Sequence, residues 1–251
     1  MGKFDGILLC SDFDGTFALN GVPIEANMKA IRYFRENGGL FTLASGRDYD
    51  FLMPLFEGYK FGVPMINMNG ALIYDFDKRE VLLERTMAGV SVEKLMQIVR
   101  EVEGVRFINF FTKSGFKQVN IAEGDTFELI TDHSDLYKFA VRVDGEKPEG
   151  DRAKDIIAQI MTDHVIERSS SNYIEVLERE STKSPNTIAL KKAVGADTLV
   201  CVGDYENDIE MVKSADIGYA VANAIDELKA VADRVTVSCK EGAIAKIIEE
   251  L

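Results

Sequence analysis

Cysteine, histidine and positive charge are all scarce in this sequence. The three cysteines show no CxxC spacing, and Cys10 and Cys201 lie inside apolar runs, which indicates buried thiols in a reducing cytosol. Only two histidines are present, His133 and His164, so a histidine-ligated zinc site is not expected. Because 42 acidic residues outnumber 29 Lys and Arg residues, the formal net charge is -13. That charge argues against nucleic-acid partners, which need a basic surface, and against binding to anionic membranes.

Long apolar runs are also missing. No stretch approaches the ~18 apolar residues of a membrane-spanning helix, and the run Ile7–Cys10 is too short for the apolar core of a signal peptide. The sequence therefore predicts a cytoplasmic protein. Its 251 residues, of which 46% are hydrophobic, are enough to form a sizeable core without disulfides, in one large domain or two smaller ones.

Short apolar runs alternate with segments of helical period near both ends of the chain. The runs that we interpret as buried strands are 6–11, 40–44, 64–68, 198–202 and 217–221. Near-continuous apolar strands separated by amphipathic helices are typical of a parallel sheet that is covered on both faces. The sequence therefore predicts an α/β core with a Rossmann-like parallel sheet.

The middle of the chain has a different pattern, in which two helix signals lie among alternating or polar strands. These segments are 95–102, 156–161, 107–111, 138–143 and 172–177. Strands that pack against two helices are typical of an α+β unit with an antiparallel sheet. We therefore expect an α+β domain at 83–179, inserted between two halves of the α/β core at 1–82 and 180–251.

Polar groups follow three of the predicted core strands. The groups are Asp12-Phe13-Asp14-Gly15-Thr16, Ser45-Gly46-Arg47 and Gly203-Asp204-Tyr205-Glu206-Asn207-Asp208. Each group alone is also compatible with a turn or a helix cap. In open α/β sheets, however, ligands bind beyond the carboxyl ends of the strands. The three groups together therefore predict a functional site at one edge of the sheet.

Four carboxylates would meet at this edge, those of Asp12, Asp14, Asp204 and Asp208. Two such charges ~5 Å apart repel each other by ~3 kcal/mol at an effective dielectric constant of about 20. Several such pairs cost too much for a fold of ordinary stability without a counter-ion. Clustered carboxylate oxygens without histidine or thiolate favour Mg²⁺, which would also screen the charge of an incoming phosphate.

The spacing of the first group suits a pair of acids that act together in catalysis. Asp12 and Asp14, at positions i and i+2 of an extended segment, would point the same way, so one can act as nucleophile while the other handles protons. Gly15 allows the chain to turn, and the Thr16 hydroxyl can hold a phosphate oxygen.

The order of these motifs resembles that of the haloacid dehalogenase-like phosphatases. With Met68-Asn69-Gly70-Ala71 and Ala222-Asn223-Ala224, the chain looks like the Cof-type branch, which carries an α/β cap between the second and third motifs. The resemblance covers the whole core. One motif alone would be a weak signal, but four in this order are specific. The predicted insertion at 83–179 would then be the cap domain.

The resemblance implies roles for the acidic residues. Asp12 would attack phosphorus and form an aspartyl-phosphate. Asp14 would protonate the leaving alcohol and then activate the hydrolytic water. Mg²⁺ would be held by the Asp12 carboxylate, the Asp14 backbone carbonyl and Asp204, with Asn207 and Asp208 in support.

The resemblance also implies a binding site for the phosphate. Ser45 and the backbone N–H of Gly46 would bind the phosphoryl oxygens, with Thr16 and Asn207 as further contacts. Arg47 would either contact the phosphate or the substrate, or form an ion pair within the core.

A lysine should form the third motif, shortly before a helix predicted at 187–194. Counting forward from the strand at 173–175 gives Lys183, whereas counting back from Ala189-Leu190 gives Asn186. We favour Lys183, because an asparagine cannot balance the charge of the nucleophile and the phosphate. Asn223 is compatible with a position beside the phosphate and with a helix N-cap.

The sequence therefore predicts a Mg²⁺-dependent phosphatase that acts on small phosphorylated metabolites, with sugar phosphates as the default class. The cap would close over the site and select the leaving group. The alternatives are a sugar phosphomutase and a non-catalytic metabolite-binding protein. The expected partner is a small-molecule phosphate ester, without nucleic acid or membrane, and the expected state is a monomer or a small homo-oligomer.

Overall fold

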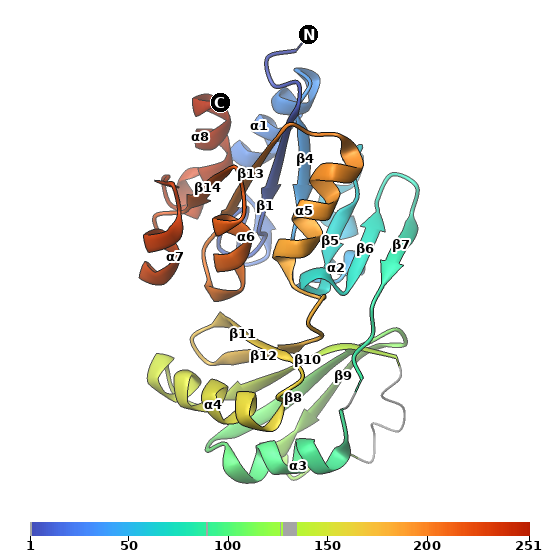
Figure 1. The fold of residues 1–251 in the computed structure, drawn as a ribbon, viewed down its shortest axis with the longest axis vertical. Helices are drawn as coiled ribbons and strands as arrows, with labels where there is room; N and C mark the ends of the chain where they lie inside the picture. Colours follow the sequence, from blue (N-terminus) through green and yellow to red (C-terminus); the bar gives the residue numbers. More distant parts are fainter. Residues whose placement is uncertain (1, 89, 126, 128–134) are drawn as a thin grey trace. The chain divides into compact units, whose positions relative to one another are not determined.

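The computed structural model describes residues 2–88, 90–125, 127 and 135–251, so His133 lies outside the described residues. The chain forms two compact units (Figure 1). The core unit is Met1–Leu83 with Lys183–Leu251, and the inserted unit is Glu84–Thr182. The domain boundaries predicted after residues 82 and 179 lie shortly before these two divisions.

A five-stranded parallel sheet forms the centre of the core unit, in the order β15-β14-β13-β1-β4. Its strands are β1 (Ile7–Ser11), β4 (Leu40–Leu43), β13 (Thr198–Gly203), β14 (Ile217–Ala220) and β15 (Arg234–Val235). Cys10 and Cys201 pair in register on β1 and β13 and are fully buried, as predicted for structural thiols. The parallel sheet confirms the predicted α/β core.

Helices cover both faces of this sheet, with α5 and α6 in front of it and α1 behind it in Figure 1. The helices of the core unit are α1 (Glu25–Glu36), α2 (Tyr49–Leu52), α5 (Lys183–Val194), α6 (Ile209–Lys213), α7 (Asp226–Val231) and α8 (Ala243–Glu250). α1 buries Asn27, Ile31 and Phe34 at helical spacing. The Asn27 side-chain oxygen accepts hydrogen bonds from Ile244 N–H and Ala245 N–H at 3.1 and 3.2 Å. This contact joins the two sequence halves of the core unit.

Two smaller sheets contain the remaining strands that begin before residue 84. They are β2 (Ala18–Leu19) with β3 (Val22–Pro23), and β5 (Met65–Asn67) with β6 (Leu72–Asp75) and β7 (Glu80–Glu84). The sequence predicted 64–68 as a strand of the parallel sheet. β5 pairs antiparallel with β6, and it joins the edge of the parallel sheet through a parallel bridge between Ala44 and Ile66.

The inserted unit consists of an antiparallel sheet and two long helices. The strand order is β11-β12-β10-β8-β9. Its elements are α3 (Val92–Glu101), β8 (Val105–Thr112), β9 (Gly115–Asn120), β10 (Leu136–Val143), α4 (Lys147–Ile160), β11 (Val165–Ser170) and β12 (Tyr173–Leu177). Apolar residues from α3, α4 and the sheet form a separate hydrophobic core. This arrangement matches the α+β pattern read from the sequence.

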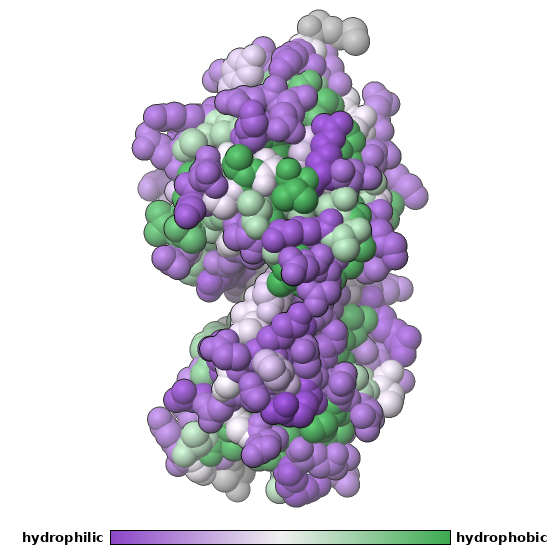
Figure 2. Space-filling view, turned by 90° about the vertical axis from the view of Figure 1, so that its left-hand side faces the viewer, coloured by the Kyte–Doolittle hydropathy of each residue, from purple (hydrophilic) through white to green (hydrophobic). Residues whose placement is uncertain are grey.

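The surface is largely polar, as Figure 2 shows for one face of the molecule. Val22 and Phe116 are the most exposed large apolar side chains among the described residues. None of the described helices is both long enough and apolar enough to cross a lipid bilayer.

Candidate active site

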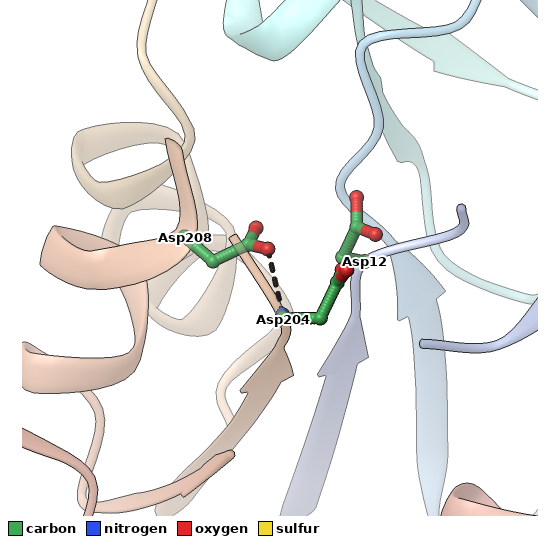
Figure 3. A group of neighbouring side chains, drawn as sticks. All are labelled: Asp12, Asp204 and Asp208. Carbon is green, nitrogen blue, oxygen red and sulfur yellow. Dashed lines mark hydrogen bonds between the residues drawn. The ribbon is translucent and has the colours of Figure 1, made fainter. Parts of the chain in front are cut away.

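The carboxyl ends of β1 and β13 bring three aspartates together. The two strands are parallel neighbours, and the Asp12 N–H donates to the Val202 carbonyl oxygen at 2.9 Å. Asp12 follows β1, Asp204 follows β13, and Asp208 ends the 3₁₀ turn η5 (Glu206–Asp208) (Figure 3). One carboxylate oxygen of each lies within 4.8 Å of the other two. We call these three residues the aspartate cluster.

A buried lysine neutralises part of the aspartate cluster. Lys183 Nζ lies 2.5 Å from Asp12 Oδ1 and 2.7 Å from Asp208 Oδ1, and the lysine is 1% exposed. Burial by itself lowers the pKa of Lys183, but the two carboxylates outweigh it and raise that pKa above its ordinary value. Lys183 is therefore a charged group held between two acids.

The position of Lys183 corrects the predicted start of the following helix. The sequence predicted this helix at 187–194, with the lysine in a loop, whereas α5 begins at Lys183 itself. The physical reason is the place of Pro185 in the first turn. Backbone N–H groups there have no partner within the helix, so a proline costs no hydrogen bond.

Asp208 shapes the loop that presents Asp204. Its Oδ2 accepts hydrogen bonds from the backbone N–H groups of Asp204 at 3.0 Å and Tyr205 at 3.3 Å, while its Oδ1 contacts the lysine. A Cβ atom at Gly203 would lie 2.4 Å from the Asp208 Cβ. The loop can therefore close over Asp208 only with glycine at position 203.

Asp204 carries the least compensated charge of the cluster. Within the described residues it forms no ion pair, and its Oδ1 accepts a hydrogen bond from the Thr16 hydroxyl at 3.0 Å. Burial, followed by the neighbouring Asp208, raises the pKa of Asp204 to about 7. Burial also raises the pKa of Asp12, against the opposing effect of Lys183. The three carboxylates of the cluster have only the Lys183 ammonium group to offset their negative charge among the described ion pairs. Their oxygen atoms are hard donors and suit a divalent cation.

The turn after β4 places Ser45 and Arg47 beside the loop after β1. Ser45 N–H donates to the Ile66 carbonyl oxygen at 2.8 Å, and Arg47 N–H donates to Ser45 Oγ at 3.1 Å. The Arg47 Nε and Nη2 donate to the two carboxylate oxygens of Asp14 at 2.8 and 3.1 Å. Because the two side chains are 45% and 42% exposed, water screens this pair and it can exchange for other contacts.

The other predicted site residues lie in the same loops. Thr16 is fully buried, and Gly46 lies between Ser45 and Arg47. Asn207 is buried in η5. The N-cap interpretation of Asn223 is wrong, because the N-cap of α7 is Ile225 and no side chain caps that helix.

Two residues that the sequence reasoning did not single out also reach these loops. The Phe51 ring lies 4.4 Å from the Arg47 guanidinium carbon. The Cys239 N–H donates to Asn223 Oδ1 at 2.8 Å, and its thiol donates to the Ala18 carbonyl oxygen at 3.3 Å. No motif marks Cys239, since its two contacts reach residues that are 16 and 221 positions away in the sequence.

Comparison with known proteins agrees with this geometry. The family model for haloacid dehalogenase-like hydrolases matches residues 9–248. The 5-amino-6-(5-phospho-D-ribitylamino)uracil phosphatase YcsE of Bacillus subtilis is 28% identical over 247 residues, which cover 96% of this chain and 94% of that protein. A second phosphatase of the same name, YitU of Bacillus subtilis, is 21% identical over 263 residues, which cover 97% of this chain and 96% of that protein.

Solved structures share the fold over nearly the whole chain. A protein of Streptococcus mutans aligns with a TM-score of 0.80 at 23% identity and covers 97% of both chains. A sugar phosphatase of HAD subclass IIB aligns with a TM-score of 0.77 at 20% identity, covering 97% of this chain and 98% of that one. Since the family model spans almost all of the sequence and the relatives are phosphatases, this chain belongs to the haloacid dehalogenase-like hydrolases and is a phosphoric monoester hydrolase.

Proposed function

We propose that this enzyme hydrolyses phosphorylated small metabolites with Mg²⁺, through a phosphoryl group carried transiently on Asp12. The contact between Lys183 Nζ and Asp12 Oδ1 at 2.5 Å is the observation that carries this proposal. The ammonium group of Lys183 fixes the orientation of the buried Asp12 carboxylate and offsets its negative charge. It can therefore attack a phosphate that is itself negatively charged.

In the proposed reaction, an Asp12 oxygen forms a bond to phosphorus while the ester P–O bond breaks. Asp14, released from its pair with Arg47 and in its protonated form, would give its proton to the leaving alcohol, and the resulting carboxylate would take a proton from the water that attacks the aspartyl-phosphate. The second step releases inorganic phosphate and restores the Asp12 carboxylate. Lys183 stabilises the negative charge next to Asp12 in both steps.

The cation would bind to the oxygens that the protein leaves available. Both Asp208 oxygens already accept hydrogen bonds, from Lys183 and from two backbone N–H groups. We therefore propose Asp12, Asp204 and the Asp14 backbone carbonyl as the ligands, with Asp208 and Asn207 in support. When bound, Mg²⁺ supplies the positive charge that offsets the phosphate.

The phosphate oxygens would be held by the turn after β4. We propose Ser45 Oγ and the Gly46 N–H as donors, because the backbone of this turn is fixed by the hydrogen bond from Ser45 N–H to Ile66. The Thr16 hydroxyl donates to Asp204, so we propose that it orients Asp204 and does not bind the phosphate directly. Arg47 would contact the phosphate only when its pair with Asp14 opens.

The leaving group is proposed to be a sugar or a sugar alcohol. The relative at 28% identity is named for a phosphorylated ribityl compound, which supports a polyhydroxylated substrate for this chain. A phosphate-release screen over phosphorylated sugars, sugar alcohols and cofactors, with Mg²⁺ present, identifies the class. Recovery of inorganic phosphate with the matching alcohol distinguishes hydrolysis from a phosphomutase reaction.

The direct test of the mechanism is the Asp12→Asn variant, assayed with an aryl phosphate in a Mg²⁺ titration. Loss of the nucleophile should lower kcat by roughly 10³-fold or more. Asp226→Asn is the matched control, because the Asp226 side chain is 100% exposed at the start of α7. Activity of Asp12→Asn within a few fold of the wild type would refute the proposed mechanism.

A further inference from the structure

Asn223 bridges two loops that are far apart in the sequence. It lies in the segment between β14 and α7. Its Nδ2 donates to the Gly15 carbonyl oxygen at 2.9 Å, and its Oδ1 accepts from the Cys239 N–H at 2.8 Å. Both ends of the amide are therefore used, and the bridge crosses 208 residues to reach the loop after β1.

The loop that Asn223 reaches presents the predicted cation ligands. Gly15 adopts a left-handed conformation with φ +82°, and a Cβ atom there would lie 2.4 Å from Asp204 Oδ2. The next residue, Thr16, donates its hydroxyl to Asp204 Oδ1 at 3.0 Å. Gly15 and Thr16 thus lie directly against Asp204, one of the proposed cation ligands.

A second contact fixes the far end of the bridge. Cys239 is 2% exposed, and its thiol donates to the Ala18 carbonyl oxygen at 3.3 Å. Ala18 lies three residues after Gly15 and its carbonyl also accepts from the Gly15 N–H at 2.9 Å. The loop after β1 is consequently held at two points by residues from the C-terminal part of the chain.

We propose that Asn223 is a positioning residue that holds the Gly15–Thr16 peptide against Asp204 and so sets the geometry of the cation site. Both of these hydrogen bonds go to backbone groups, so Asn223 would act through the backbone that it binds. The inference rests on the proposed function, since it concerns the affinity of that site for Mg²⁺. Outer groups that orient metal ligands commonly contribute 10- to 100-fold to metal affinity.

The test compares Asn223→Ala with the wild type by two measurements. The first is the rise in Tm as Mg²⁺ is added to chelator-treated protein, and the second is kcat and KM for phosphate release across a Mg²⁺ titration. We expect the Mg²⁺ concentration for half-maximal effect to rise by roughly 10-fold or more in both measurements. The kcat at saturating Mg²⁺ should stay closer to that of the wild type.

Asn37→Ala is the matched control for the loss of one amide hydrogen bond. Asn37 Nδ2 donates to the Tyr33 carbonyl oxygen at 2.8 Å at the end of α1, also within the core unit. This variant should leave the Mg²⁺ dependence unchanged. If Asn223→Ala lowers the Tm of the metal-free protein but keeps the wild-type Mg²⁺ dependence, Asn223 is only a structural residue and the inference is wrong.

Asn223→Asp provides a second, independent test. An aspartate keeps an oxygen for the Cys239 N–H but has no N–H for the Gly15 carbonyl. Its added negative charge should attract Mg²⁺, so weaker Mg²⁺ binding would come from the broken contact with the Gly15 carbonyl and not from the change of charge. Equal or tighter binding by this variant would refute the inference. If the wild type itself shows no Mg²⁺ dependence, the proposed function fails, and this outcome is recognised before any variant is compared.

Discussion

The ionisation of Asp204 should destabilise the metal-free protein in a way that can be measured. Burial and Asp208 raise the pKa of Asp204 from its ordinary value of 3.8 to about 7. Between these pH values the folded state keeps a proton that the unfolded state has lost. The free energy of unfolding therefore falls as the pH rises through this window. At about 1.4 kcal/mol for each tenfold change in proton affinity, the full effect is about 4 kcal/mol at pH 8.

Asp204→Asn removes this charge and keeps an oxygen that can accept the Thr16 hydrogen bond. In the presence of a chelator, the variant should be about 2–4 kcal/mol more stable than the wild type at pH 8. The difference should shrink as the pH falls and become small near pH 3, below the ordinary value of 3.8, where Asp204 is protonated in the folded state and largely protonated in the unfolded state. The variant should also lose the stabilisation by Mg²⁺ and the phosphatase activity, because the proposed ligand is gone.

The assay is urea denaturation at a series of pH values, with chelator and then with Mg²⁺. Asp216→Asn is the control of opposite sign. Its carboxylate accepts hydrogen bonds from Lys191 and the Leu199 N–H, which hold the pKa of Asp216 below its ordinary value. That substitution should therefore destabilise the protein at pH 8. If metal-free Asp204→Asn is no more stable than the wild type at pH 8, the charge deficit that we infer for the aspartate cluster does not exist.

Three further substitutions test other parts of the site. Lys183→Met leaves two buried carboxylates without their cation, so it should destabilise the metal-free protein by about 3–5 kcal/mol in urea denaturation and abolish turnover. Arg47→Lys keeps the charge but loses the two-point contact with Asp14, so kcat should fall by up to about 10²-fold with less change in KM. An unchanged kcat would show that the pair does not position Asp14. Gly15→Ala places a Cβ atom against Asp204 at a residue with positive φ. The substitution should lower the free energy of unfolding by more than about 1 kcal/mol and weaken Mg²⁺ binding. A variant with the Tm and the Mg²⁺ response of the wild type would contradict this.

The fold and the position of the site follow largely from local features of the sequence. Apolar runs such as 6–11 and 198–202 specify strands that are buried on both faces, and these are β1 and β13 in the parallel sheet. Polar residues that directly follow such strands must lie at their carboxyl ends. Asp12 and Asp204 therefore had to meet at one edge once the two strands were parallel neighbours, and the order of the motifs was enough to predict the family.

The contacts that complete the site depended on the tertiary structure. Sequence counting left Lys183 and Asn186 as alternatives for the lysine motif, whereas in the fold Lys183 begins α5 and its Nζ lies between two carboxylates. Likewise, nothing near Asn223 in the sequence indicates that its amide holds the Gly15 carbonyl. Local propensity acts over a few residues, but these hydrogen bonds join segments that are 171 and 208 residues apart. Their partners are set by strand register and helix packing, so only the folded chain could decide them.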